Sequence, residues 1–131
     1  MKKYFIIPVT FLLIAIHSDA QKKKYSFTNE YINWKNRTDY FNWKVFMNAD
    51  DSYLASIKQI EYYLDPTYKT SKIVITQASG GKNFTLCTNG WGEFTLRIKI
   101  VFKNSNTKPI NETYVLNLKS PEKKNKNYKC P

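Results

Sequence analysis

Apolar and polar residues alternate with a period of two through most of this chain. The clearest run covers residues 93–102, where Leu96, Ile98 and Ile100 fall on one face and charged or polar side chains on the other. Such alternation is typical of a half-buried strand. Shorter alternating or β-branched runs predict further strands over residues 43–47, 60–64, 72–76, 84–87 and 113–118, with a start near Ile57 left open for the second of these. Residues 22–42 alternate less clearly, and we expect one more strand there without fixed bounds.

Turn-forming residues separate the predicted strands. They cluster at residues 48–52, 65–67, 79–81, 89–90 and 104–109. No window keeps the 3.6-residue period of a helix. Strands that recur about every ten residues predict an all-β fold, an immunoglobulin-like antiparallel β-sandwich in a single domain.

The N-terminus has the three parts of an export signal. Met1-Lys2-Lys3 is basic, residues 5–16 are mostly apolar, and Ser18-Asp19-Ala20 offers small residues for cleavage before Gln21. An uncut membrane anchor is the alternative, but the apolar run is shorter than the ~20 residues of a spanning helix. We therefore expect a signal peptide over residues 1–20 of a bacterial protein that is periplasmic or secreted.

The remaining chain divides into three segments by composition. Residues 21–38 form an N-terminal extension that includes a possible first strand, residues 39–119 the β-sandwich, and residues 120–131 a Lys-rich C-terminal tail.

The net charge of +11 comes largely from the two ends of the chain. Seven of the 21 basic residues lie at positions 22–24 and 123–129, and Arg37 and Arg97 are the only arginines. Arginine is the residue that base and bidentate phosphate recognition favours, so specific nucleic-acid binding is not expected. Solvated ends, with weak attraction to an anionic surface, are the expected role of the lysines.

The lack of histidine excludes most enzyme classes. The one histidine, His17, lies in the predicted signal peptide, so the mature chain has no Ser-His-Asp or Cys-His site. No cofactor or metal site is expected, because the usual zinc ligand is missing. Cys87 and Cys130 form a possible disulfide, with two independent thiols as the alternative.

Two segments carry more than a generic β pattern. Residues 60–68, IEYYLDPTY, form an alternating strand that ends in Asp-Pro and then Thr-Tyr. Residues 89–94, NGWGEF, form a Gly-rich turn that carries Trp91 before the long strand. Together with residues 42–46, NWKVF, they make residues 41–118 resemble the YEATS family, and more precisely its prokaryotic branch.

The resemblance implies a recognition module. Eukaryotic YEATS domains are readers of acylated lysine with an aromatic slot built from these two loops. The implied ligand-binding residues are Asp65, Thr67, Tyr68, Gly90, Trp91 and Gly92. Tyr68 and Trp91 would be opposite walls, and the Thr67 hydroxyl would bond the acyl amide. Where acyl-lysine readers carry a histidine, this chain has Asp65.

Physical chemistry supports such a slot but leaves its ligand open. Two aromatic faces suit a flat or cationic group, and glycines allow positive φ or close approach of another chain. The ligand is expected to be an acylated amine, a peptide or a glycan. One alternative is a structural or adaptor β-sandwich that holds a protein partner through a sheet edge or face, with Trp91 packed as a core plug. The other is a hydrolase that uses Asp65 and Glu93 as a carboxylate pair.

Overall fold

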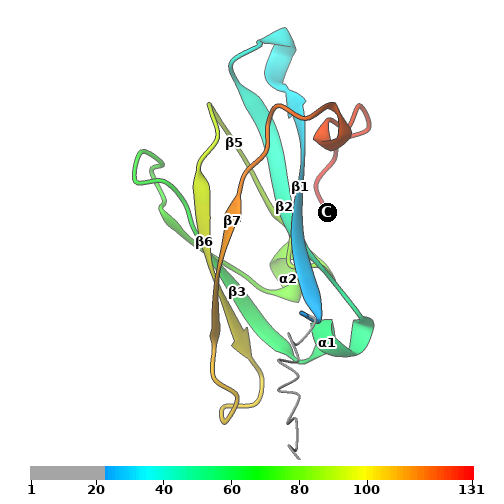
Figure 1. The fold of residues 1–131 in the computed structure, drawn as a ribbon, viewed down its shortest axis with the longest axis vertical. Helices are drawn as coiled ribbons and strands as arrows, with labels where there is room; N and C mark the ends of the chain where they lie inside the picture. Colours follow the sequence, from blue (N-terminus) through cyan, green and yellow to red (C-terminus); the bar gives the residue numbers. More distant parts are fainter. Residues whose placement is uncertain (1–22) are drawn as a thin grey trace, which may run out of the picture.

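The computed structural model describes residues 23–131, which fold into two packed β-sheets (Figure 1). The predicted signal peptide, Gln21 and Lys22 lie outside the described residues. The strands are β1 (Tyr25–Asn33), β2 (Phe41–Ala49), β3 (Ile57–Tyr63), β4 (Lys72–Ile75), β5 (Leu86–Gly90), β6 (Thr95–Phe102) and β7 (Ile110–Val115). The short helices are α1 (Asp51–Ala55), α2 (Gln77–Gly80) and the 3-10 turns η1 (Trp34–Asn36) and η2 (Pro121–Lys123).

All neighbouring strands in both sheets are antiparallel. One sheet has the order β1-β2-β5 and the other the order β4-β3-β6-β7. The β1–β2 hairpin is long, with Tyr25 paired to Ala49 and Asn33 to Phe41. The predicted all-β, immunoglobulin-like β-sandwich in a single domain is confirmed.

The apolar faces of the two sheets meet in one core. The side chains of Trp43, Val45 and Met47 on β2 are fully buried, as are those of Leu96 and Ile100 on β6. Each large apolar side chain removed from water contributes about 1.5–3 kcal/mol. The period of two therefore fixes which face of each strand turns inward.

Two of the expected strands have different bounds in the structure. The run at residues 84–87 is not a strand from its start, because Phe84 adopts a φ of 52° and its carbonyl accepts a hydrogen bond from Tyr62 Oη at 2.7 Å. The strand begins at Leu86 instead. At the other end, Leu116 and Leu118 are buried as predicted but follow the end of β7. In these segments the alternation of apolar and polar residues predicts which side chains are buried, but not which residues pair in a strand.

The predicted N-terminal extension contains β1, and side chains of this strand contact both sheets. Asn29 on β1 is fully buried and its amide faces the chain that follows β7. Asn29 Oδ1 accepts bonds from Tyr114 Oη at 2.6 Å and from the Asn117 N–H at 3.0 Å, while Nδ2 donates to the Asn117 carbonyl at 2.7 Å. This amide satisfies three polar groups at the sandwich edge, so β1 joins both sheets.

The C-terminal residues 120–131, here called the C-terminal strap, lie against β1 and β2 rather than extending into solvent. Lys124 forms a parallel bridge with Tyr31, and the Asn125 N–H donates to the Tyr31 carbonyl at 2.9 Å. A disulfide joins Cys130 to Cys87 on β5. The backbone of the C-terminal strap is therefore docked on the sandwich, while Lys124, Lys126 and Lys129 are exposed to solvent as expected.

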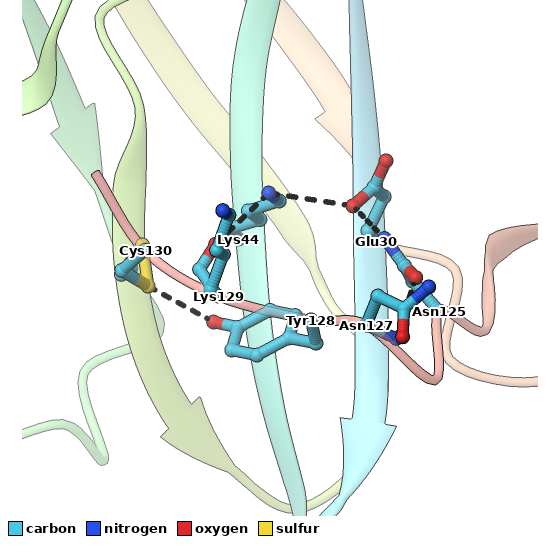
Figure 2. Close-up of polar contacts among 8 residues, drawn as sticks. Glu30, Lys44, Asn125, Asn127, Tyr128, Lys129 and Cys130 are labelled. Carbon is cyan, nitrogen blue, oxygen red and sulfur yellow. Dashed lines mark hydrogen bonds and ion pairs between the residues drawn. A yellow bond between two sulfur atoms is a disulfide. The ribbon is translucent and has the colours of Figure 1, made fainter.

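Figure 2 shows the contacts that hold the C-terminal strap. Lys44 Nζ on β2 donates to the Lys129 carbonyl at 3.0 Å and lies 3.4 Å from Glu30 Oε2. The same carboxylate oxygen accepts a bond from Asn125 Nδ2 at 2.9 Å. The ammonium of Lys44 also lies over the Tyr128 ring, 5.6 Å from its centroid. Side chains of β1 and β2 thus contact both the backbone and the side chains of the C-terminal strap.

Candidate functional site

Three loops meet at one end of the sandwich. The β1–β2 hairpin, the β3–β4 loop and the β5–β6 turn all lie toward the top of Figure 1, away from α1. They surround an open pocket of about 490 Å³, here called the loop pocket. Its lining residues are Tyr40, Thr67, Tyr68, Lys69, Thr88, Asn89, Gly90 and Trp91.

Trp91 stands in solvent at the edge of the loop pocket. Its side chain is 62% exposed, so it does not plug the core. The indole packs edge-to-face with Tyr40, at 4.8 Å between centroids and 83° between ring planes. The guanidinium of Arg37 lies 5.2 Å from the indole centroid. The β1–β2 hairpin therefore supports an indole that is free to contact a ligand.

Gly90 allows Tyr68 to pass beneath the turn. A Cβ on Gly90 would lie 2.9 Å from Tyr68 Cζ and still closer to Oη, so only glycine fits there. The Tyr68 ring packs at a tilt against Phe94, with 5.6 Å between centroids. Tyr68 consequently lines the pocket from below and pairs with Phe94, while Tyr40 is the ring that pairs with Trp91.

Two buried polar atoms lie beneath the loop pocket without a hydrogen-bond partner among residues 23–131. They are Tyr68 Oη and Trp43 Nε1. Burial raises the pKa of the Tyr68 phenol, and the nearby indole N–H of Trp43 offsets part of this effect. Tyr68 is therefore a neutral phenol at physiological pH.

Gly92 has a different role from Gly90. Its φ of 68° lies in the left-handed region, which residues other than glycine rarely adopt. A Cβ there would meet no atom within 4 Å, so the constraint is backbone conformation alone. Gly92 shapes the turn that presents Trp91 and is not among the residues that line the loop pocket.

Asp65 organises the β3–β4 loop and does not line the loop pocket. Its Oδ1 accepts hydrogen bonds from the Thr67 N–H at 3.0 Å and from Thr67 Oγ1 at 2.8 Å. These bonds hold the pKa of the Asp65 carboxyl below its usual range, so it is ionised at neutral pH. Because the Thr67 hydroxyl donates its proton to Asp65, its oxygen keeps lone pairs that can accept a further hydrogen bond, and Thr67 lines the pocket.

The β1–β2 hairpin contributes Tyr40 to the loop pocket, which no sequence motif indicates. Tyr40 Oη donates to Asn89 Oδ1 at 2.7 Å, which ties the hairpin to the β5–β6 turn. Arg37 Nε and a terminal guanidinium nitrogen lie 3.2 and 3.3 Å from the carboxylate oxygens of Asp39. The aromatic residues at positions 34, 40 and 41 are visible in the sequence, but without strand bounds they could not be assigned to this end of the fold.

The sequence model of the YEATS family matches residues 37–120. This match covers well over half of the chain, and it includes the β3–β4 loop and the β5–β6 turn of the pocket. The chain belongs to the YEATS family.

Solved YEATS domains have the same fold. The Yaf9 YEATS domain recognising a succinylated histone H3 peptide is 27% identical and superposes with a TM-score of 0.55, covering 72% of this chain and 70% of that one. The yeast AF-9 homologue Yaf9 is 28% identical, with a TM-score of 0.54 and coverage of 72% and 69%. A Yaf9 YEATS domain bound to an acetylated histone H3 peptide is 24% identical, with a TM-score of 0.53 and coverage of 76% and 79%.

YEATS domains are binding modules and not enzymes, and the carboxylates of this chain are arranged accordingly. Glu93 Oε2 accepts a bond from the Leu118 N–H at 3.2 Å, and Oε1 lies 3.2 Å from Lys119 Nζ. Asp65 is bonded to Thr67 instead. The two carboxylates thus serve separate local contacts, and within residues 23–131 no group of three His, Cys, Asp or Glu side chains is placed to hold a metal ion.

The two cysteines of the chain form the disulfide that the sequence offered as one alternative. Cys87 and Cys130 are 43 residues apart in the sequence and are bonded to each other. No helix among the described residues is long and apolar enough to cross a membrane.

Proposed function

We propose that this YEATS domain is an exported binding module that takes an acylated amine, in the form of an acylated lysine side chain of a peptide, in the loop pocket. The observation that carries the proposal is the position of Trp91. Trp91 is 62% exposed and lines a pocket that Thr67 and Tyr68 also line. A core plug would have no exposed face to offer a ligand.

The groups around the loop pocket suit a flat amide on an apolar stem. The Thr67 oxygen is free to accept the amide N–H, because its own proton goes to Asp65. Aromatic rings cover the planar acyl group and the methylenes of the stem. Each methylene removed from water contributes about 0.8 kcal/mol.

The relatives support this ligand class. A YEATS domain with 27% identity is described as recognising a succinylated histone H3 peptide. Assignment of this chain to the prokaryotic branch remains part of the proposal. The position at which acyl-lysine readers carry a histidine is Asp65 here, and because Asp65 does not line the loop pocket, the amide would depend on Thr67 and on backbone groups of the Gly90 turn.

Export is supported by the disulfide independently of the N-terminal sequence. Structural disulfides persist in oxidising compartments such as the periplasm and the extracellular space, and they are rare in the cytosol. The Cys87–Cys130 bond fixes the C-terminal strap to β5, so it belongs to the folded structure. An exported domain would meet extracytoplasmic proteins or peptides as its partners.

Calorimetric titration tests the proposed ligand class. The protein starting at Gln21 is titrated with peptides that carry acetylated, succinylated or unmodified lysine, and with cell-wall glycan fragments. We expect binding of an acylated peptide that weakens at least tenfold in Trp91→Ala, about 1.4 kcal/mol or more. Val115→Ala is the matched control, because Val115 is equally exposed but lies on β7.

Three outcomes would contradict the proposal. Equal affinity for the peptide with unmodified lysine would show that the acyl group is not recognised. Unchanged affinity in Trp91→Ala would show that the ligand does not bind in the loop pocket. Binding confined to glycans would keep the pocket but replace the ligand class.

A further inference from the structure

A second concave surface lies at the opposite end of the sandwich from the loop pocket. It is an open groove of about 650 Å³ between the start of β1, helix α1 and the β6–β7 loop, here called the lysine groove. Its lining residues are Lys23, Lys24, Tyr25, Tyr53, Phe102, Thr107, Lys108 and Ile110. In Figure 1 α1 and the β6–β7 loop lie toward the bottom, whereas the β1–β2 hairpin lies at the top.

Aromatic rings form the floor of the lysine groove. Tyr25 and Tyr53 are stacked, with 5.7 Å between centroids and 20° between planes. Phe102 meets Tyr53 edge-to-face at 6.0 Å. The Tyr25 hydroxyl donates to Glu112, which does not line the groove, so the polar atom of Tyr25 is already bonded and its ring adds apolar surface. A surface of this kind favours an apolar chain or ring over a polar group.

Positive charge surrounds this apolar floor and is only partly neutralised. Lys23 Nζ lies 3.0 Å from Glu112 Oε1. Lys24 and Lys108 have no carboxylate within ion-pair distance anywhere in residues 23–131. Two uncompensated ammonium groups therefore border an aromatic floor, and both are exposed to a ligand arriving from solvent.

We propose that the lysine groove binds an anionic amphiphile, a molecule with one phosphate or carboxylate group on an apolar chain or ring. The apolar part lies on Tyr53 and Phe102, and the anion contacts Lys24 and Lys108. The volume is in the range of small-molecule sites, about 300–1,000 Å³. The groove shares no residue with the loop pocket, so this proposal stands or falls independently of acyl-lysine recognition.

The same headgroup chemistry occurs in free amphiphiles and in anionic lipids, and the experiment separates the two sources. Decyl phosphate below its micelle concentration is titrated into the protein starting at Gln21, and amide NMR shifts are followed. Decanol is the uncharged comparison. In parallel, the protein is sedimented with phosphatidylglycerol vesicles and with phosphatidylcholine vesicles.

The test variant is Lys24→Gln with Lys108→Gln, and the control is Lys103→Gln with Lys126→Gln. The control removes the same charge from exposed lysines that do not line the groove. Because each lysine near an anionic surface contributes about 1 kcal/mol, we expect the test pair to weaken binding at least tenfold and the control pair by less than threefold. We expect decyl phosphate to shift the amides of Phe102, Thr107 and Ile110.

The possible results each decide the proposal. Lysine-dependent binding of decyl phosphate supports a free amphiphile, and lysine-dependent binding confined to phosphatidylglycerol vesicles supports a lipid. Absence of both kinds of binding would overturn the proposal. So would equal binding of decanol, equal loss in the control pair, or amide shifts outside the groove.

Discussion

At the scale of single residues, Gly90 and Gly92 make different contributions to the loop pocket. Gly90 provides space for Tyr68, and Gly92 provides a left-handed backbone conformation. The sequence indicates that glycine can provide space or an unusual backbone conformation, but it does not show which role each glycine has. Spacing along the chain does not reveal which distant residue packs against a given glycine. Alanine substitutions at the two positions are therefore expected to have different effects.

Gly90→Ala should displace Tyr68. The new methyl group would lie 2.9 Å from Tyr68 Cζ, which is closer than side chains tolerate. We expect a loss of about 1–3 kcal/mol in the free energy of unfolding from overpacking, together with loss of ligand binding. Urea denaturation and peptide titration measure the two effects.

Gly92→Ala is the matched control for this prediction. It places a methyl group in open space and strains only the backbone, at roughly 1–2 kcal/mol. Tyr68 should keep its position, so ligand affinity should fall much less than in Gly90→Ala. Equal affinities for the two variants would contradict the role assigned to Gly90.

At the scale of elements, side-chain contacts join β1 to β7 across the sandwich edge. Glu112 on β7 accepts a hydrogen bond from Tyr25 on β1 and lies 3.0 Å from Lys23 Nζ. The Tyr25 hydroxyl, followed by Lys23, holds the pKa of Glu112 below its ordinary value of 4.5, against a smaller opposing effect of burial. This contact makes the docking of β1 sensitive to pH.

The stability contributed by ionised Glu112 should depend on pH in a defined direction. Since the folded pKa lies below the unfolded value, the contribution is present above about pH 4.5 and is lost as the pH falls through the folded pKa. Glu112→Gln should therefore lower the unfolding free energy at pH 7 and flatten its decline at acidic pH. Thermal unfolding from pH 7 to pH 3 measures this.

Glu122→Gln serves as the control for the pH series. Glu122 is exposed in η2 and forms no ion pair with any described residue. Its replacement should leave the pH curve unchanged. If the unfolding free energy of Glu112→Gln changes with pH in parallel with that of the wild type, Tyr25 and Lys23 do not stabilise the ionised Glu112 carboxylate in the folded protein.

The C-terminal strap is the second element whose attachment can be measured. A cross-link between residues 43 apart restricts the unfolded chain by about 4 kcal/mol in the loop-entropy description. Cys87→Ser with Cys130→Ser should lower the unfolding free energy by that order and speed hydrogen exchange at the Asn125 amide. Affinity for peptide should stay within twofold, because the strap does not line the loop pocket.

Unchanged stability in this double variant would indicate that noncovalent contacts suffice to hold the strap. A large loss of peptide affinity would instead indicate that the strap supports the loop pocket. Wild-type protein treated with a reductant should reproduce the double variant, since both lack the same bond.

The sequence predicts the elements with a strong period of two, and it fails where burial arises from contacts between distant segments. The inward faces of β2 and β6 follow directly from alternation. The burial of Asn29 depends on polar groups almost 90 residues away, so no local pattern indicates it. In the candidate site, the loops around Tyr68 and Trp91 are recognisable as motifs, whereas Tyr40 reaches them only through the β1–β2 hairpin.

At the scale of the whole molecule, the two proposed binding surfaces lie at opposite ends of one sandwich. The loop pocket is formed by three turns, and the lysine groove lies where the described chain begins. An exported domain attached to an anionic surface through the lysine groove would present the loop pocket away from that surface. This arrangement follows from strand direction alone, because antiparallel strands place alternate turns at opposite ends.

Export predicts a specific processing event. When the full chain is produced in a secreting bacterial host, mass spectrometry should find protein that begins at Gln21 and has no free thiol. The apolar run at residues 5–16 and the small residues before position 21 are the reason for this expectation. Intact Met1 with reduced cysteines in the cytoplasm would contradict export.

The proposed function requires Trp91 to contact an acylated side chain in the loop pocket. Its most direct test is fluorescence of the Trp34→Phe variant, in which only the exposed Trp91 and the buried Trp43 remain to report. Titration with an acylated-lysine peptide should give a saturable change in emission, and the unmodified peptide should give none. A flat response to every acylated peptide, with the fold intact, would contradict the account.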